Sequence, residues 1–104
     1  MNIAKMMQAA TRIQNDMKAM QENLKTLPFE ATVSGVSVTI LGSGVVQHLS
    51  IDAALINPAD KETLEDVVVA AINQARQKMD EHVASETKKL MGGLQLPPGF
   101  QLPF

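Results

Sequence analysis

Residues 29–52 read FEATVSGVSVTILGSGVVQHLSID, and this stretch decides the fold. Apolar residues recur at every second position in three runs, which is the period of a strand with one buried face. The runs are Phe29, Ala31 and Val33, then Val36, Val38 and Ile40, then Leu49 and Ile51. Ser34-Gly35 fits a two-residue hairpin turn, and Gly42-Ser43-Gly44 offers a looser second turn. The stretch therefore predicts three short antiparallel strands.

The segment before the strands has the spacing of a helix. From Ile3 to Leu27, apolar residues recur at alternating steps of three and four, which puts them on one stripe, here called the seam. The seam consists of Ile3, Met6, Ala10, Ile13, Met17, Met20, Leu24 and Leu27. Pro28 ends the helix because it lacks the backbone N–H that continuation needs. We expect the seam to pack on the protein's own core, on a second subunit or on a foreign partner.

A second, longer helix follows the strands. Asn57-Pro58-Ala59-Asp60 has the form of a helix start, with Asn57 as the cap and Pro58 at the first helical position. Helical spacing then continues to about Met91, and Gly92-Gly93 ends the helix. Residues 58–91 span roughly 50 Å at about 1.5 Å per residue, so the far end is expected to project or to meet another chain. The fold class is α+β, an α-β-β-β-α protomer with a three-stranded antiparallel sheet and two long helices.

The 104 residues predict one domain, over residues 1–93, followed by a proline-rich tail over residues 94–104. The tail is expected to dock on the protein itself, to be disordered or to act as bait for another domain. Neither an export signal nor a membrane helix is predicted. Polar residues interrupt the first eight positions, and the uncharged residues 31–51 are rich in Ser, Thr and Gly.

No motif for catalysis or for metal binding is recognised. The chain has no cysteine, which excludes disulfides, thiol nucleophiles and thiolate metal sites. His48 and His82 lack the spacing of a metal motif, and no glycine-rich loop leads into a helix as phosphate cradles do. We therefore expect neither an enzyme nor a bound cofactor or metal.

The charge is unevenly distributed along the chain. The formal net charge is −2, which does not suggest a strong positive field, yet residues 1–27 carry four bases against two acids. Lys5 and Arg12 share one heptad position, and Lys18 and Lys25 share another, which predicts a basic strip beside the seam. Such a strip either tracks DNA phosphates or only keeps the helix soluble. Lys88-Lys89, at the end of the second helix, either complement its dipole or contact phosphate.

Two stretches resemble the YbaB/EbfC family of bacterial nucleoid-associated proteins. They are DKETLEDVVVAAINQA at residues 60–75 and LPPGF at residues 96–100. The Met- and Gln-rich first helix and Leu49-Ser50-Ile51-Asp52 agree more loosely. The resemblance covers nearly the whole chain. It implies a tweezers-like homodimer, cytoplasmic and nucleoid-associated, that binds duplex DNA with little sequence preference and affects nucleoid organisation and gene expression.

We expect the DNA contacts to be basic side chains that neutralise phosphates and do not recognise individual nucleobases. They are Arg12, Lys18, Lys25, Lys78, Lys88 and Lys89. The chain departs from many members of the family by a short first turn and by Ser37, Gln47 and His48 where those members have bases on the sheet. An alternative is therefore a dimeric adaptor that presents its first helix or tail to replication or recombination proteins, with weak or no DNA binding.

Overall fold

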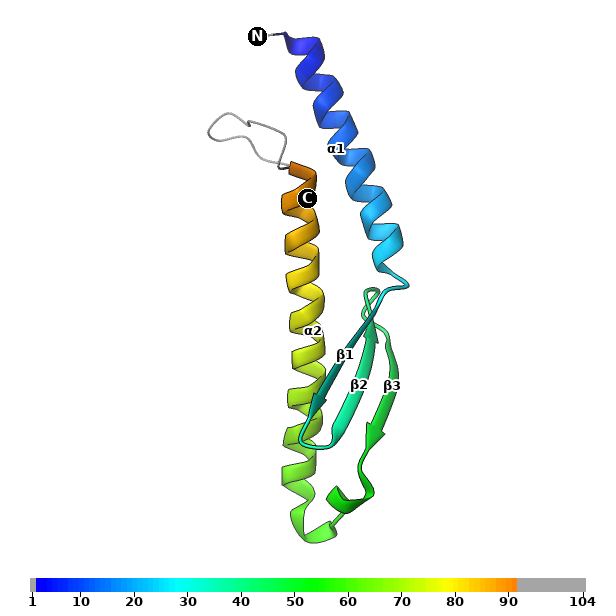
Figure 1. Cartoon of the computed structure of the whole chain (residues 1–104), viewed down its shortest axis with the longest axis vertical. Helices are drawn as coiled ribbons and strands as arrows, with labels where there is room; N and C mark the ends of the chain where they lie inside the picture. Colours follow the sequence, from blue (N-terminus) through cyan, green and yellow to red (C-terminus); the bar gives the residue numbers. More distant parts are fainter. Residues whose placement is uncertain (1, 92–104) are drawn as a thin grey trace.

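A computed structural model describes residues 2–91. The elements are α1 (Ile3–Leu24), β1 (Pro28–Val33), β2 (Val36–Leu41), β3 (Val46–Ile51), the 3₁₀ turns η1 (Ala53–Leu55) and η2 (Pro58–Asp60), and α2 (Lys61–Met91). The three strands form one antiparallel sheet in the order β1-β2-β3 (Figure 1). The predicted α-β-β-β-α order is confirmed. The predicted stop at Gly92-Gly93 and the tail over 94–104 lie outside the described residues.

Both predicted turns connect the strands as expected. Ser34 and Gly35 have φ angles of 47° and 91°, the two positive values that a tight two-residue hairpin turn requires. Gly44, with φ of 93°, lies in the second turn, where the Gly44 N–H donates to the Leu41 carbonyl. The resulting register aligns Ala31, Val38 and Leu49 across the sheet, so the predicted apolar positions share one face.

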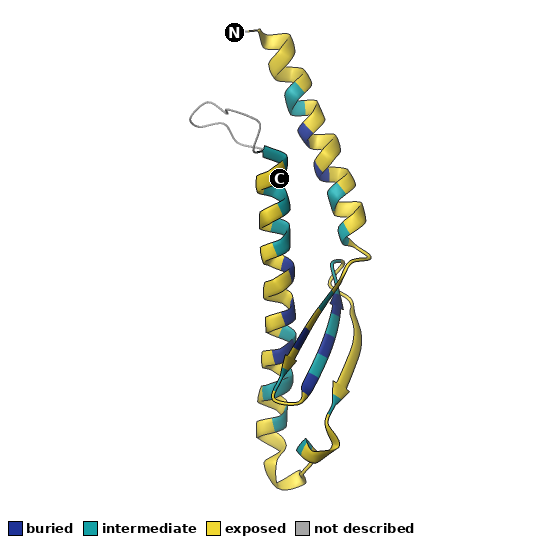
Figure 2. Ribbon diagram, in the orientation of Figure 1, coloured by how far each residue is buried: buried dark blue, intermediate teal, exposed yellow. Residues whose placement is uncertain are grey.

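The core lies between this face and α2. Ala31, Val36, Val38, Ile40, Ala71 and Ala75 form one buried cluster. Ala71 and Ala75 are fully buried, and their small side chains let α2 approach the sheet closely. The helix packs on β1 and β2, whereas β3 is almost wholly exposed (Figure 2). Leu49 and Val46, which share the apolar face, remain 43% and 47% exposed.

Two predicted helix boundaries are wrong by three residues each. The helix α1 ends at Leu24 rather than Leu27, and Pro28 begins β1, because proline disfavours helical backbone at the residue before it. The helix α2 begins at Lys61 rather than Pro58. Asn57 does act as a cap, since its side chain accepts a 3.0 Å hydrogen bond from the Ala59 N–H. The turn that Asn57 caps, however, is η2.

The two helices run side by side in opposite directions along the last turns of α2 (Figure 1). The end of α2 projects beyond the sheet, as predicted, and lies beside α1 of the same chain. In the middle of the seam, Ile13 and Met17 are buried, so this part packs within the chain. The first turns of α1 extend beyond α2, and Ile3 is 73% exposed.

One close contact fixes α1 to the sheet. The Gly42 N–H donates a 2.9 Å hydrogen bond to the Leu27 carbonyl, just after α1. A Cβ atom at Gly42 would collide with the backbone carbonyl of Leu24. The turn between β2 and β3 therefore requires glycine where the end of α1 rests on it. The molecule that results is elongated, with extents of 68 × 25 × 17 Å.

Candidate nucleic-acid interface

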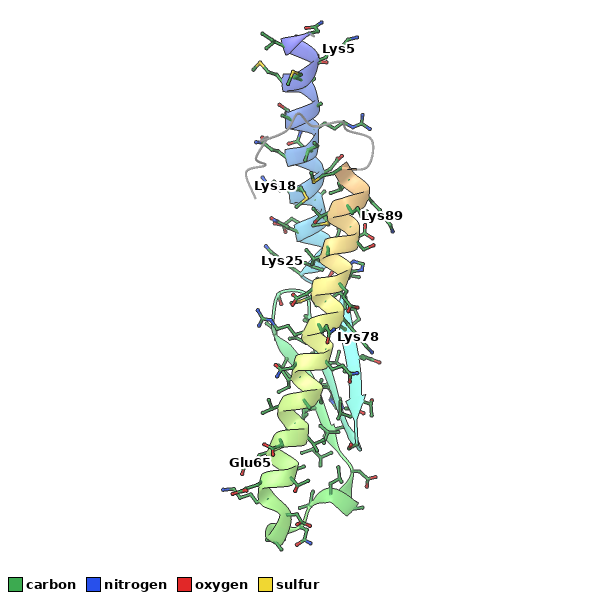
Figure 3. All side chains as sticks on the ribbon, turned by 90° about the vertical axis from the view of Figure 1, so that its left-hand side faces the viewer. Lys5, Lys18, Lys25, Glu65, Lys78 and Lys89 are labelled. Atoms are coloured by element: carbon green, nitrogen blue, oxygen red, sulfur yellow. The ribbon has the colours of Figure 1, made fainter. Side chains whose placement is uncertain are left out.

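Charge is segregated along the long axis of the molecule. The helical end, formed by residues 2–27 and 76–91, carries eight bases and five acids. The sheet end, formed by residues 28–75, carries one base and six acids, among them Glu65 (Figure 3). The helical end is therefore net positive by three charges and the sheet end net negative by five. A polyanion is attracted to the first end and repelled by the second.

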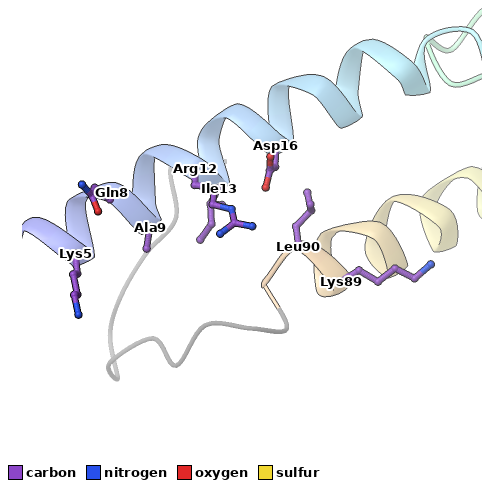
Figure 4. Close-up of a pocket in the computed structure, with 8 residues that line it drawn as sticks. All are labelled: Lys5, Gln8, Ala9, Arg12, Ile13, Asp16, Lys89 and Leu90. Atoms are coloured by element: carbon purple, nitrogen blue, oxygen red, sulfur yellow. The ribbon is translucent and has the colours of Figure 1, made fainter.

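A cavity of about 750 Å³ lies between the two helices at the positive end (Figure 4). Bases from both helices line it, namely Lys5 and Arg12 from α1 and Lys89 from α2. Its other lining residues are Gln8, Ala9, Ile13, Asp16 and Leu90. The apolar lining residues Ile13 and Leu90 are here called the floor of the cavity, and the charged ones, three bases and one acid, its rim.

The bases of α1 do not form the single strip that the sequence predicts. Arg12 and Lys18 are six residues apart, which separates them by about 120° around a helix. In agreement, Lys18 and Lys25 lie on one side of the molecule, and Lys5, Lys78 and Lys89 lie on the other (Figure 3). Lys5 and Arg12 therefore belong with the cavity, and Lys18 and Lys25 form a second basic flank.

The predicted DNA-contact residues differ in the hydrogen bonds and ion pairs that they already form within the chain. The Lys78 ammonium donates a 2.7 Å hydrogen bond to the Glu30 carbonyl of β1, so Lys78 ties α2 to the sheet. Lys25 and Lys89 form exposed ion pairs with Glu22 and Glu86, each at 3.3 Å. Pairs so exposed are worth little and open readily to another anion. Arg12, Lys18 and Lys88 are exposed on the helices.

The structure adds Lys5 to the predicted set. This residue lines the cavity with Arg12, although it lies outside the set of contacts expected from the sequence. The signal was available, because Lys5 and Arg12 are seven residues apart and so share one side of α1.

The sheet provides no base to such an interface. Its face turned away from α2 bears Glu30, Thr32, Ser37, Thr39, His48 and Ser50. Thr32 and Ser37 share a 2.9 Å hydrogen bond there. Within residues 2–91, no group of acids and histidines is arranged to hold a metal ion, and no helix is long and apolar enough to cross a membrane. The bases on the two helices are thus the feature that a ligand of opposite charge would recognise.

Comparison with known proteins gives this feature a context. Residues 1–94 match the model of the YbaB/EbfC DNA-binding family. The chain belongs to this family. A nucleoid-associated protein of Rhodospirillum centenum is 44% identical over 105 residues, covering 99% of this chain and 98% of the relative. One from Rhodospirillum rubrum is 42% identical, covering 99% and 98%. One from Brucella ovis is 42% identical, covering 95% and 94%.

Membership of the family confirms the resemblance inferred from residues 60–75 and 96–100. A DNA-binding protein needs cations that face a phosphate backbone. Among the described residues, the two helices carry nearly all of those cations.

Proposed function

We propose that this chain is a homodimeric, nucleoid-associated protein that binds duplex DNA through its phosphates, with little sequence preference and without catalysis. It would act in the cytoplasm, on the nucleoid, and so affect nucleoid organisation and gene expression. The relatives are named nucleoid-associated proteins. The observation that carries the proposal is the gathering of bases from α1 and α2 at the one positive end of an elongated molecule.

The placement of the bases favours phosphate contact over base reading. Direct readout needs several side chains from one element fitted into a groove. Here the bases point to two flanks of α1 and to the end of α2, so they are spread rather than focused. Spread cations neutralise phosphates at any sequence, and their effect depends strongly on salt.

Homodimerisation is supported by the exposed apolar surface on β3. Val46 and Leu49 lie on the same face of the sheet as the core residues, but α2 packs on β1 and β2 and leaves β3 uncovered. The strand is also an edge of the sheet, with backbone groups that can pair with another strand. A second copy related by a two-fold axis would present the same strand and the same apolar residues, which makes the surface self-complementary. It would also double the number of cations available to one duplex.

Fluorescence anisotropy on random-sequence duplexes, at about 50 to 200 mM salt, tests DNA binding. We expect log affinity to fall linearly with log salt, at about −0.9 per phosphate contact. The variant Arg12→Glu/Lys18→Glu, which reverses one base on each flank of α1, should weaken binding to all sequences alike and make the slope shallower. Lys61→Glu is the control for charge reversal away from the helices, because Lys61 is exposed at the acidic end. This control should bind like the wild type.

Two results would contradict the proposal. If Lys61→Glu lost half as much binding free energy as the double variant, net charge alone would act, without a located interface, because Lys61→Glu changes the charge by two units and the double variant by four. Absence of binding at 50 mM salt, from a folded protein, would favour the adaptor function instead. Sedimentation of the same sample gives its mass, and a monomer at micromolar concentration would remove the homodimer from the proposal.

A further inference from the structure

The outer end of α1 carries apolar side chains that nothing in residues 2–91 covers. Ile3 and Met7 are 73% and 66% exposed, and Met6 is also exposed. Ile3 and Met6 belong to the same seam as Ile13, which forms part of the cavity floor. The seam therefore continues as one apolar path from the cavity out to the tip of α1.

The chemistry of this path favours an apolar, uncharged occupant. DNA offers phosphates, which suit Lys5 and Arg12 on the rim but do not cover Ile3 or Met6. The rest of this chain contains a segment of the right composition. Residues 94–104, LQLPPGFQLPF, have no charged side chain and include three leucines and two phenylalanines. Their three prolines restrict the backbone beforehand, which lowers the entropy lost on docking.

The point where the described chain ends places this segment next to the cavity. Leu90 lines the cavity, and the described residues stop at Met91. Eleven residues reach up to about 36 Å when extended, whereas Ile13 and Ile3 are about 15 Å apart along α1. A short tether also gives the segment an effective concentration of the order of millimolar, which a free partner must exceed.

We propose that residues 94–104 occupy the cavity between α1 and α2 and cover the exposed part of the seam in their own chain. Leucine and phenylalanine side chains of the segment would replace water over Leu90 and Met6. The Met-rich character of α1 suits such a contact, because methionine adapts its shape to irregular apolar surfaces. The positive rim of the cavity would stay open to solvent beside the docked segment.

Paramagnetic broadening in methyl NMR of the full chain tests this assignment. The chain has no cysteine, so Gln101→Cys takes a single nitroxide label. In protein labelled at isoleucine and methionine methyls, we expect Ile3, Met6 and Met7 to lose most of their intensity relative to the reduced nitroxide. Ile56 is the matched control, because it is 63% exposed in the loop at the opposite end of the molecule. Its signal should keep its intensity.

A mixed sample and a second variant complete the test. Spin-labelled, isotopically unlabelled protein is mixed with isotope-labelled protein lacking the nitroxide. Broadening in this sample as strong as in the single-chain sample would overturn the proposal in favour of a segment from a second copy. Leu96→Ser/Phe100→Ser in the spin-labelled chain should restore most of the intensity at Ile3 and Met6, with an unchanged circular dichroism spectrum. Intensity unaffected by the label, or broadening that persists in this variant, would overturn the proposal.

Discussion

The two ends of this molecule are built from the same α2 helix but are packed in different ways. At the sheet end, six residues from three elements form one buried cluster, and Val36 and Ala71 are fully covered. At the helical end, α2 packs on α1 and keeps two contacts with β1, from Lys78 to Glu30 and from His82 to Phe29. Ile13, Met17 and Met79 are buried there outside that cluster, and Ile13 also lines the open cavity. The sheet end therefore holds most of the buried core, and the helical end leaves a cavity open between its helices.

The largest expected effect comes from a pair of substitutions that lie opposite each other in the sheet. Val38 and Leu49 are cross-strand neighbours on one face, but they are 1% and 43% exposed. Val38→Asp buries an unpaired carboxylate and should cost more than about 4 kcal/mol, enough to unfold most of the chain. Leu49→Asp should leave the circular dichroism spectrum unchanged while halving the mass measured by sedimentation.

Each half of this pair has its own contradicting result. A folded Val38→Asp variant would mean that the core does not depend on β2. Unfolding of Leu49→Asp at high protein concentration would place β3 inside the stabilising core rather than at an interface. A Leu49→Asp variant that keeps the wild-type mass would remove β3 from the proposed dimer contact.

The second effect separates the two ends by local stability. Ile13→Ala removes a buried side chain between the helices and should cost about 2–4 kcal/mol, because it leaves a cavity. The loss should be confined to the helical end, so hydrogen exchange of the α1 amides should accelerate while the β2 amides stay protected. Ile56→Ala replaces an exposed isoleucine and should change the free energy of opening by no more than about 0.5 kcal/mol in either α1 or β2. Equal acceleration in α1 and β2 would mean that the two ends unfold as one unit.

The third effect concerns the hydrogen bond between Lys78 of α2 and Glu30 of β1, which joins the helical end to the sheet end. Lys78→Met removes the hydrogen bond from α2 to the Glu30 carbonyl and should cost about 1 kcal/mol in urea unfolding. Lys88→Met removes an exposed ammonium from the same helix and should change the stability by less than about 0.5 kcal/mol. In DNA binding the order should reverse, because Lys88 is free to contact phosphate. If Lys78→Met lowered the DNA affinity more than Lys88→Met, Lys78 would be a DNA contact as well as a bond to the sheet.

Much of the sheet end could be predicted from the sequence, because its signals are local. Period-two apolar residues and Ser34-Gly35 specify the strands and their first turn, and the register follows from the turn. The helix boundaries at Leu24 and Lys61 could not be placed to the residue. They depend on how Pro28 begins a strand and on η2 forming before α2, which are consequences of tertiary packing.

The helical end was harder to predict because its arrangement depends on how two distant helices meet. Heptad spacing predicted the seam, but not that Ile13 would be buried within the chain while Ile3 stays exposed. The sequence also placed Lys78 among free bases, since no local pattern indicates a bond to a residue 48 positions away. The heptad positions of the four bases of α1 suggested one basic strip. At about 100° per residue, however, Lys18 and Lys25 lie on a different side of the helix from Lys5 and Arg12.

The smallest expected effect concerns the ion pair between Lys25 and Glu22. Both side chains are mostly exposed, so Glu22→Gln should change the free energy of unfolding by less than about 0.5 kcal/mol. It should nevertheless tighten DNA binding slightly, because it removes a negative charge from the positive end and frees Lys25 for phosphate. Glu65→Gln, which frees Lys61 at the acidic end, is the matched control and should leave the affinity unchanged. Equal tightening in both variants would show that DNA senses the total charge rather than the separation of the two ends.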